Sequence, residues 1–374
     1  MEWNEKEQQL LQKLSHEIQI PKGQVKKVID LIEEGNTVPF IARYRKEQTG
    51  SLDEVQIRNI FEKWQYLQNI EKRKEEVLRL IEEQGKLTEE LKIQIMKSDK
   101  LQQVEDLYRP YKQKRRTKAT VAKEKGLEPF ANWLLTFPLN VKVEEEASKF
   151  LSEEKEVREV EEVIQGAKDI IAEVVSDDAS FRQWIRDITY KQGVITSSVK
   201  DEEKDERGVY TIYYEYEEPV GKILPHRILA LNRGEKEEIL KVSIKAPVDK
   251  IHTFLEKRVV KNSSSAAAFI VKEAMEDSYK RLIEPAIERE IRKELTEKGE
   301  EQAIHIFSEN LRKLLLQPPL KDKVVLGVDP AYRTGCKLAV VDDTGKVLHI
   351  AVIYPTPPKN EIEKGKLVVK ELIR

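Results

Sequence analysis

The sequence is poor in cysteine, with Cys336 the single one among 374 residues. One cysteine excludes an internal disulfide and a zinc site built from several thiolates, and it fits a reducing setting. The chain also lacks any apolar run near the roughly 18 residues that a membrane-spanning helix needs. Its first residues, Met1–Leu14, have neither the basic start nor the apolar block of a secretory signal peptide. We therefore expect a cytoplasmic protein that does not contact a membrane.

Several motifs that carry enzyme chemistry are missing as well. There is no G-x-G-x-x-G fingerprint and no Walker A spacing, so the common nucleotide-binding loops are excluded. Cys336 has no base nearby in the sequence, and we expect it to be buried at the start of a strand rather than nucleophilic. The histidines are scattered without a His-x-x-x-His pair: His16, His226, His252, His305 and His349. The sequence therefore predicts no cofactor and no metal site.

Aromatic residues make up only 7% of the chain, which argues against an all-β sandwich. Charged residues make up 36% and hydrophobic residues 39%, the balance of a highly charged, helix-rich protein. The chain has 66 Lys and Arg residues against 68 Asp and Glu residues, so its net charge at pH 7 is only −2. Because the total charge is close to zero, an electrostatic partner has to be inferred from local patches.

Apolar residues recur at helical spacing through most of the chain. Ser51-Leu-Asp-Glu54 has the spacing of a capping box at the start of one long pattern. Pro285 is expected to kink the last helix and Pro318-Pro319 to end it, while 191–245 mixes helix and strand signals with a turn at Gly234. The acidic stretch 141–162 is expected to be a solvated helical face. Helices are predicted over 5–18, 22–34, 54–83, 157–190 and 263–317, with shorter ones across 88–137.

The pattern changes near the end of the chain. Val324–Val328, Lys337–Val341 and Val347–Tyr354 are short apolar runs typical of strands, and Asp342–Gly345 between the last two is a good hairpin turn. Helical spacing returns after Pro358. The sequence thus predicts a mainly α protein whose last part is the start of an α/β domain.

The segment "DLYRPYKQKRRTKAT" concentrates positive charge in a loop, since Pro110 interrupts any continuous helix. Such a cluster can neutralise phosphates, and the interleaved Tyr108 and Tyr111 can stack on bases. A solvated loop tied to acidic neighbours is the competing interpretation, and the composition leaves both open. The candidate phosphate contacts are Arg109, Lys112, Lys114, Arg115, Arg116 and Lys118.

A second candidate is "VPFIARYRKEQTG", in which Arg43, Arg45 and Lys46 lie beside Phe40 and Tyr44. Here the competing interpretation is favoured: the apolar residues belong to the core and the basic residues pair with helix carboxylates. Arg43 and Arg45 are kept as candidate nucleic-acid contacts.

Asp329 follows the first apolar run and is the single catalytic candidate. A carboxylate at a strand exit can bind Mg²⁺ in a ribonuclease-H-type nuclease, or lie in the phosphate loop of an actin-like ATPase with Thr334, Gly335 and Lys337. It can also simply form a turn with Pro330. A lone aspartate cannot hold two metal ions, and Asp342 and its neighbour belong to a turn at the far end of the hairpin. We therefore expect no catalysis by this chain.

Several stretches, in order along the chain, resemble one family, that of the bacterial transcription accessory protein Tex. They are "IPKGQVKKVIDLIEEGNTVPFIARYRKEQTGSLDE", "DLYRPYKQKRRTKATVAKEKGLEPFA", "LNRGEKEEIL", "LIEPAIEREIRKELTEKGEEQAI", "FSENLRKLLLQPPL" and "VLGVDPAYRTGCKLAVVDDTGKVL". The resemblance implies an N-terminal helical part over 1–64, a helical spacer over 65–204, a helix-turn-helix-like and long-helix part over 205–320, and the start of a YqgF-like, ribonuclease-H-like domain over 321–374. The first helices would contribute to the helix-turn-helix-like module.

The same resemblance places Asp329 at the position of the first acid of the ribonuclease-H fold, with Ala331 where resolvase relatives usually have glycine. It also implies that the chain is the N-terminal fragment of a longer protein that continues with helix-hairpin-helix domains and an S1 domain. The function it implies is a transcription accessory role as a non-catalytic scaffold bound to RNA or DNA, with RNA polymerase as a possible partner. A metal-dependent nuclease or resolvase, and a protein-interaction scaffold for the polymerase, are the alternatives.

Overall fold

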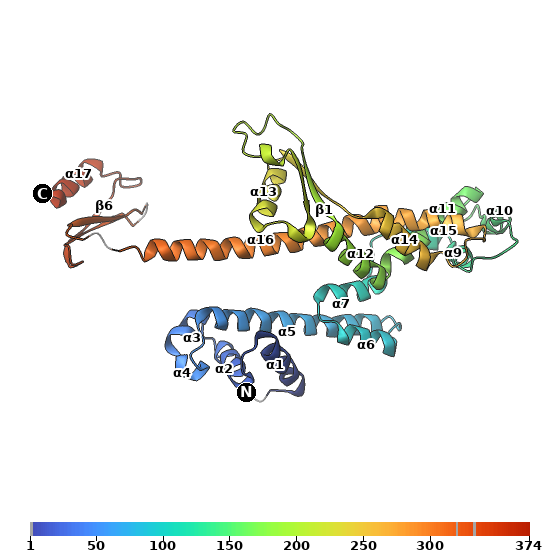
Figure 1. The fold of residues 1–374 in the computed structure, drawn as a ribbon, viewed down its shortest axis with the longest axis horizontal. Helices are drawn as coiled ribbons and strands as arrows, with labels where there is room; N and C mark the ends of the chain where they lie inside the picture. The colour runs from blue at the N-terminus through green and yellow to red at the C-terminus, as the bar shows by residue number, and fades with distance from the viewer. Residues whose placement is uncertain (1–2, 319–320, 332–333) are drawn as a thin grey trace. The chain divides into compact units, whose positions relative to one another are not determined.

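The structure is a computed structural model that describes residues 3–318, 321–331 and 334–374. The chain forms two compact units, Met1–Glu300 and Glu301–Arg374. The described part is mostly helical and contains two small antiparallel sheets, one in each unit (Figure 1). No helix in these residues is long and apolar enough to cross a membrane.

The N-terminal helices pack along one long helix, α5 (Figure 1). Their shared core contains Leu14, Val28, Ile41 and Ile57, all fully or almost fully buried. The predicted helices over 5–18, 22–34 and 54–83 are confirmed. The elements are α1 (Glu5–Ile18), α2 (Lys22–Glu33), α3 (Val38–Tyr44), α4 (Lys46–Thr49) and α5 (Glu54–Glu82).

The start of α5 differs from the prediction. Asp53, not Ser51, is the N-cap, and it forms a capping box in which its carboxylate accepts a bond of 2.8 Å from the Gln56 backbone N–H. Ser51 has φ of 63° directly after Gly50 and belongs to the turn that ends α4. The predicted capping box was therefore two residues too early.

A second small core holds the C-terminal half of α5 against α6 (Glu89–Lys97) and α7 (Leu101–Tyr108). Val77, Ile95 and Val104 are fully buried there. These short helices, and α8 and α9 below, agree with the short helices predicted across 88–137.

The largest core begins with α8 and is built around α11. The single helix predicted over 157–190 is in fact two helices. The carboxylate of Asp178 accepts bonds from the backbone N–H groups of Ser180 and Phe181, and so begins a new helix. The acidic stretch before it is only partly helical. The elements are α8 (Lys118–Glu124), α9 (Glu128–Leu134), α10 (Val143–Ala147), α11 (Val160–Asp177) and α12 (Ala179–Gln192).

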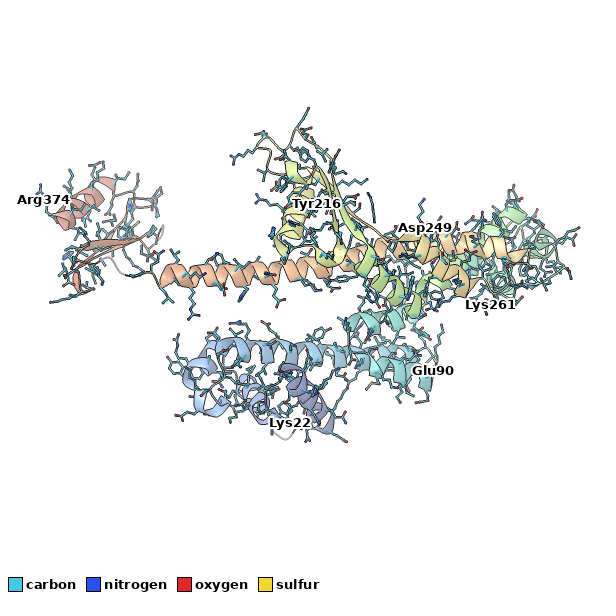
Figure 2. The ribbon with its side chains drawn as sticks, viewed as in Figure 1. Lys22, Glu90, Tyr216, Asp249, Lys261 and Arg374 are labelled. Carbon is cyan, nitrogen blue, oxygen red and sulfur yellow. The ribbon has the colours of Figure 1, made fainter. Side chains whose placement is uncertain are left out.

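The first sheet is antiparallel, with strand order β2-β1-β3. Its strands are β1 (Val194–Val199), β2 (Glu215–Pro219), which carries Tyr216 (Figure 2), and β3 (Leu240–Lys245). Helix α13 (Pro225–Lys236) connects β2 to β3 and runs through Gly234, where a turn was predicted. A Cβ at this position would lie 2.6 Å from Cδ1 of Leu240. Gly234 therefore serves close packing of helix on strand rather than a turn.

The rest of the largest core is helical. Helices α14 (Val248–Val259) and α15 (Ala267–Asp277) are followed by a π-helical segment, Ser278–Ile283, and by α16 (Glu284–Leu315). The π turn lies directly before Pro285, where a kink was predicted, and proline lacks the N–H that an α-helical ladder requires. Helix α16 ends just before Pro318, as predicted, while Pro319 lies outside the described residues.

The second unit confirms the predicted strands and the helix after them. Antiparallel strands β4 (Val325–Asp329), β5 (Cys336–Val341) and β6 (Val347–Ile353) lie in the order β4-β5-β6, followed by α17 (Ile362–Ile373). Cys336 is buried, as expected.

Candidate nucleic-acid interface

The predicted basic segment runs from the end of α7 to the start of α8. Arg109–Tyr111 forms a single 3₁₀ turn, and residues 112–117 form an irregular loop. The loop ends at Thr117, whose hydroxyl accepts a bond of 3.0 Å from the Thr120 backbone N–H and so caps α8. The segment is therefore a short connection fixed at both ends by helices.

A buried ion-pair network anchors the helix that leads into this loop. Asp106 of α7 accepts bonds from Nε of Arg182 at 3.0 Å and from Nη2 of Arg186 at 2.8 Å. Glu290 of α16 accepts from the same two guanidinium groups at 2.8 and 2.9 Å. Arg182 is 0% exposed, so each of its charged partners is needed. In the sequence, the one local feature that could have indicated this network is the i, i+4 spacing of the two arginines on α12.

Half of the predicted phosphate contacts already form ion pairs with carboxylates of the same chain. Nε of Arg109 lies 3.3 Å from Oδ1 of Asp177, and Lys114 pairs with Asp177 and, at 3.3 Å, with Glu173. Nη2 of Arg116 lies 3.2 Å from Glu124. Burial, followed by the nearby charge of Arg182, lowers the pKa of Arg109. For these three cations, the loop is tied to acidic neighbours, as the competing interpretation held.

The other half of the cluster is exposed and without such partners. No carboxylate of the described residues lies within 4.0 Å of the charged groups of Lys112, Arg115 or Lys118. We call these three residues the free loop cations. Their role as phosphate contacts stays a prediction.

The two tyrosines of the segment differ from the expectation. Tyr108 is only 7% exposed, belongs to the core between α5 and α7, and has the guanidinium of Arg73 5.4 Å from its ring centroid. Tyr111 is half-buried against the same core, and its backbone carbonyl accepts a bond from Gln84. The expectation that Tyr108 stacks on a base is therefore wrong.

The second candidate segment agrees with the favoured interpretation only in part: Val38 and Ile41 are buried in the core, whereas its aromatic residues lie at the surface. Phe40 and Tyr44 on α3 are 37% and 60% exposed, and their ring centroids lie 5.1 Å apart. The guanidinium of Arg45 lies 5.0 Å from the Phe40 centroid. In the part of the chain that the structure describes, no carboxylate lies within 4.0 Å of the charged groups of Arg43, Arg45 or Lys46. We call these five residues the α3 patch.

Asp329 ends β4, with its side chain 73% exposed and Nζ of Lys337 4.0 Å away. Asp342 is engaged elsewhere: its carboxylate accepts bonds from the Thr344 hydroxyl and from two backbone N–H groups, and these bonds lower its pKa. The strand register places Asp329 and Asp342 at opposite ends of β5. Within the described ranges, no group of three or more His, Cys, Asp or Glu residues is arranged to hold a metal ion.

Comparison with known protein families gives three matches in order along the chain. They are the Tex-like protein N-terminal domain over residues 8–82, the Tex central region-like family over 139–307, and the Tex protein YqgF-like domain over 323–374. Together they match most of the chain.

Curated proteins with similar sequences extend over nearly the whole chain. It is 62% identical to the Bacillus subtilis protein "Uncharacterized protein YdcI", over 97% of this chain and 51% of that protein. It is 36% identical to the "Transcriptional accessory protein Tex" of Neisseria gonorrhoeae, over 96% of this chain and 48% of the relative. It is 30% identical to the human "S1 RNA-binding domain-containing protein 1", over 92% and 36%. The chain thus spans about half the length of the bacterial relatives or less.

Proposed function

Because this chain belongs to the Tex family, we propose that it acts as a Tex-like transcription accessory protein, as a nucleic-acid-associated scaffold rather than an enzyme. The observation that carries the proposal is the ordered match to three segments of this family. Relatives in Neisseria gonorrhoeae and Bordetella pertussis are named for Tex, the former as a transcriptional accessory protein. The chain spans about half the length of such relatives, so the extension of a whole relative's role to this chain is itself part of the proposal.

The free loop cations are the proposed phosphate contacts of this scaffold. They are exposed and lie within seven positions, so they can reach successive phosphates of one strand. The paired cations Arg109, Lys114 and Arg116 would instead hold the loop in place. A cation that already has a carboxylate partner must break that pair before it can bind a phosphate, whereas a free cation has no such cost.

The test is binding of labelled single-stranded RNA and duplex DNA at low salt by the chain and by the variant Lys112→Gln, Arg115→Gln, Lys118→Gln. We expect the variant to bind both about tenfold or more weakly, because each lost phosphate contact removes a counterion-release contribution. A matched control neutralises Arg79, Lys142 and Lys293, which are exposed and paired with glutamates three or four positions later in the sequence. Equal losses in the two variants, or no binding by the unmodified chain, would refute the loop assignment.

The non-catalytic part of the proposal concerns Asp329. Its exposed carboxylate has a lysine as its charged neighbour, and Asp342 is occupied by the hairpin turn. Neither arrangement favours a pair of Mg²⁺ ions, which needs several carboxylates around one point.

The proposal also covers the division of the chain into domains, its protein partner and its location. We place a helix-turn-helix-like module in the N-terminal helices and within 205–320, and we divide the chain at 1–64, 65–204, 205–320 and 321–374. The short connection between α1 and α2 is compatible with such a module. RNA polymerase is the proposed protein partner and the cytoplasm the proposed location, since the names of relatives refer to transcription.

A further inference from the structure

We propose that the α3 patch is a stacking site for unpaired bases, which gives the protein a preference for single-stranded over duplex nucleic acid. The inference rests on the proposed function in that the chain must meet a nucleic acid. It goes further because it assigns a second site, a different type of contact and a strand preference.

The local structure explains why the aromatic rings point away from the core. Helix α3 begins after Thr37 and buries Val38 and Ile41 against its neighbours. Residues three and four apart share a helix face, so Phe40, Arg43 and Tyr44 lie together on another side. This side carries two aromatic rings and a cation, and α3 lies at the N-terminal end of α5 (Figure 1).

The exposure of these rings is unusual for their size. Aromatic side chains gain most from burial, yet more than half of Tyr44 stays open to solvent. Arg45 lies over the Phe40 ring, so Tyr44 offers the larger free surface. The rings lie 5.1 Å apart at an angle of 47°, so they do not cover one another face to face.

The positive charges of the α3 patch favour a polyanion as its partner. Arg43, Arg45 and Lys46 lie within four positions and, among described residues, are not paired with carboxylates within 4.0 Å. Glu47 is the adjacent acid in the sequence and is exposed. A partner that carries both closely spaced negative charges and flat aromatic groups fits cations and rings together, and single-stranded nucleic acid has both.

Duplexes fit the patch less well. In a double helix, each base face is covered by its stacked neighbours, whereas an unpaired base can turn out and lie against an aromatic ring. The cations would contact either form through phosphates, but the rings would contribute to a single strand alone. The strand preference therefore follows from Phe40 and Tyr44, and it should disappear with them.

The experiment measures binding of the full chain at low salt to four probes of equal length: oligo(dT), oligo(rU), an abasic oligodeoxynucleotide and a duplex. The variant Phe40→Leu, Tyr44→Leu keeps apolar volume but removes the aromatic faces. We expect it to bind oligo(dT) and oligo(rU) about tenfold more weakly, as for loss of base–aromatic stacking. Its affinity for the abasic strand and for the duplex should stay unchanged.

Two controls make the result specific. Tyr66→Leu removes an exposed tyrosine from α5 of the same unit and should change none of the affinities. Tyr44→Leu alone removes the more exposed ring, and it should weaken binding of oligo(dT) and oligo(rU) by less than the double variant does. Its far-ultraviolet circular dichroism should equal that of the unmodified chain.

The outcomes separate this inference from the proposed function. If the unmodified chain binds and the loop variant is weakened, but the aromatic variant binds oligo(dT) and oligo(rU) normally, the stacking site is wrong and the loop assignment stands. Equal losses on the abasic strand and oligo(dT) also overturn stacking, because no base is then involved. If the unmodified chain binds none of the four probes, both proposals fail, and the patch is left as a surface for a protein.

Discussion

The charge of Arg182 is placed where water cannot reach it. An isolated guanidinium in such a position would cost several kcal/mol, and the cost is offset here by two carboxylates, Asp106 and Glu290. Arg186 pairs with the same two carboxylates and balances their second negative charge. The partners come from α7, α12 and α16, so this cluster joins segments that are far apart in the sequence. It also fixes Asp106, the first residue of the basic segment, three positions before its first cation, Arg109.

Asp106→Asn should therefore destabilise the protein strongly. The substitution keeps the shape of the side chain but leaves Arg182 and Arg186 with one carboxylate, and removal of one member of a buried pair costs about 3–5 kcal/mol. The free energy of unfolding is measured by urea denaturation. Asp99→Asn is the matched control, because Asp99 pairs with Lys13 at the surface and its loss should cost at most about 1 kcal/mol. Similar losses in the two variants would show that the buried network does not carry this stability.

The pairing of the basic segment shows what a sequence cannot reveal at the level of single residues. The residues that neutralise Arg109 and Lys114 lie on α11, about 60 positions later, and reach the loop through the tertiary fold alone. Composition identified the cluster but could not separate paired from free cations. The same limit applies to α3, where Phe40 and Tyr44 have the residue types of a core and nevertheless lie at the surface.

Single elements were predicted well where a helix buries a regular apolar stripe. The stripe in α5 is one example, with Ile57, Ile60 and Trp64 all buried. The prediction failed at Asp178 and Gly234, where one residue acts through a local bond or a close contact. An aspartate inside a helical pattern gives no periodic signal that distinguishes a cap from a surface position. The strands of the second unit were predicted because β-branched runs and a turn occur together.

Gly234→Ala tests the contact between α13 and β3. Alanine favours a helix over glycine by up to about 1 kcal/mol, so helix propensity alone predicts stabilisation. The new Cβ, however, would lie 2.6 Å from Leu240 Cδ1 and 3.0 Å from Tyr210 Cδ1, and both of those side chains are buried. We expect a net loss of about 1–3 kcal/mol in the free energy of unfolding, as for other overpacked cores.

Gly23→Ala is the control for this substitution. Gly23 lies in α2 and has no atom within 4 Å of an added Cβ, so the variant should be as stable as the unmodified chain or slightly more so. Stabilisation by Gly234→Ala, measured in the same urea denaturation, would mean that β3 and α13 separate easily enough to admit a methyl group.

At the scale of the whole molecule, the charges nearly cancel. A net charge of −2 provides no general attraction for a polyanion, so any binding must come from local groups. The resemblance to the Tex family identified from the sequence is confirmed by the family matches, yet such a match does not indicate which surface is used. The free loop cations and the cations of the α3 patch are two candidates in the first unit, and their contributions can be counted by salt dependence.

The slope of log affinity against log salt for single-stranded RNA should be about −4 for the unmodified chain. Each contacted phosphate contributes about −0.7 on a single strand, and the two sites together offer six cations. Neutralising Lys112, Arg115 and Lys118 should make the slope less negative by about 2, and neutralising Arg43, Arg45 and Lys46 should do the same. Because the two sites are separate segments with no shared ion-pair partner among described residues, the changes should add, and the combined variant should bind with almost no salt dependence. A combined variant that keeps a steep slope would locate the nucleic-acid contacts on other cations of the chain.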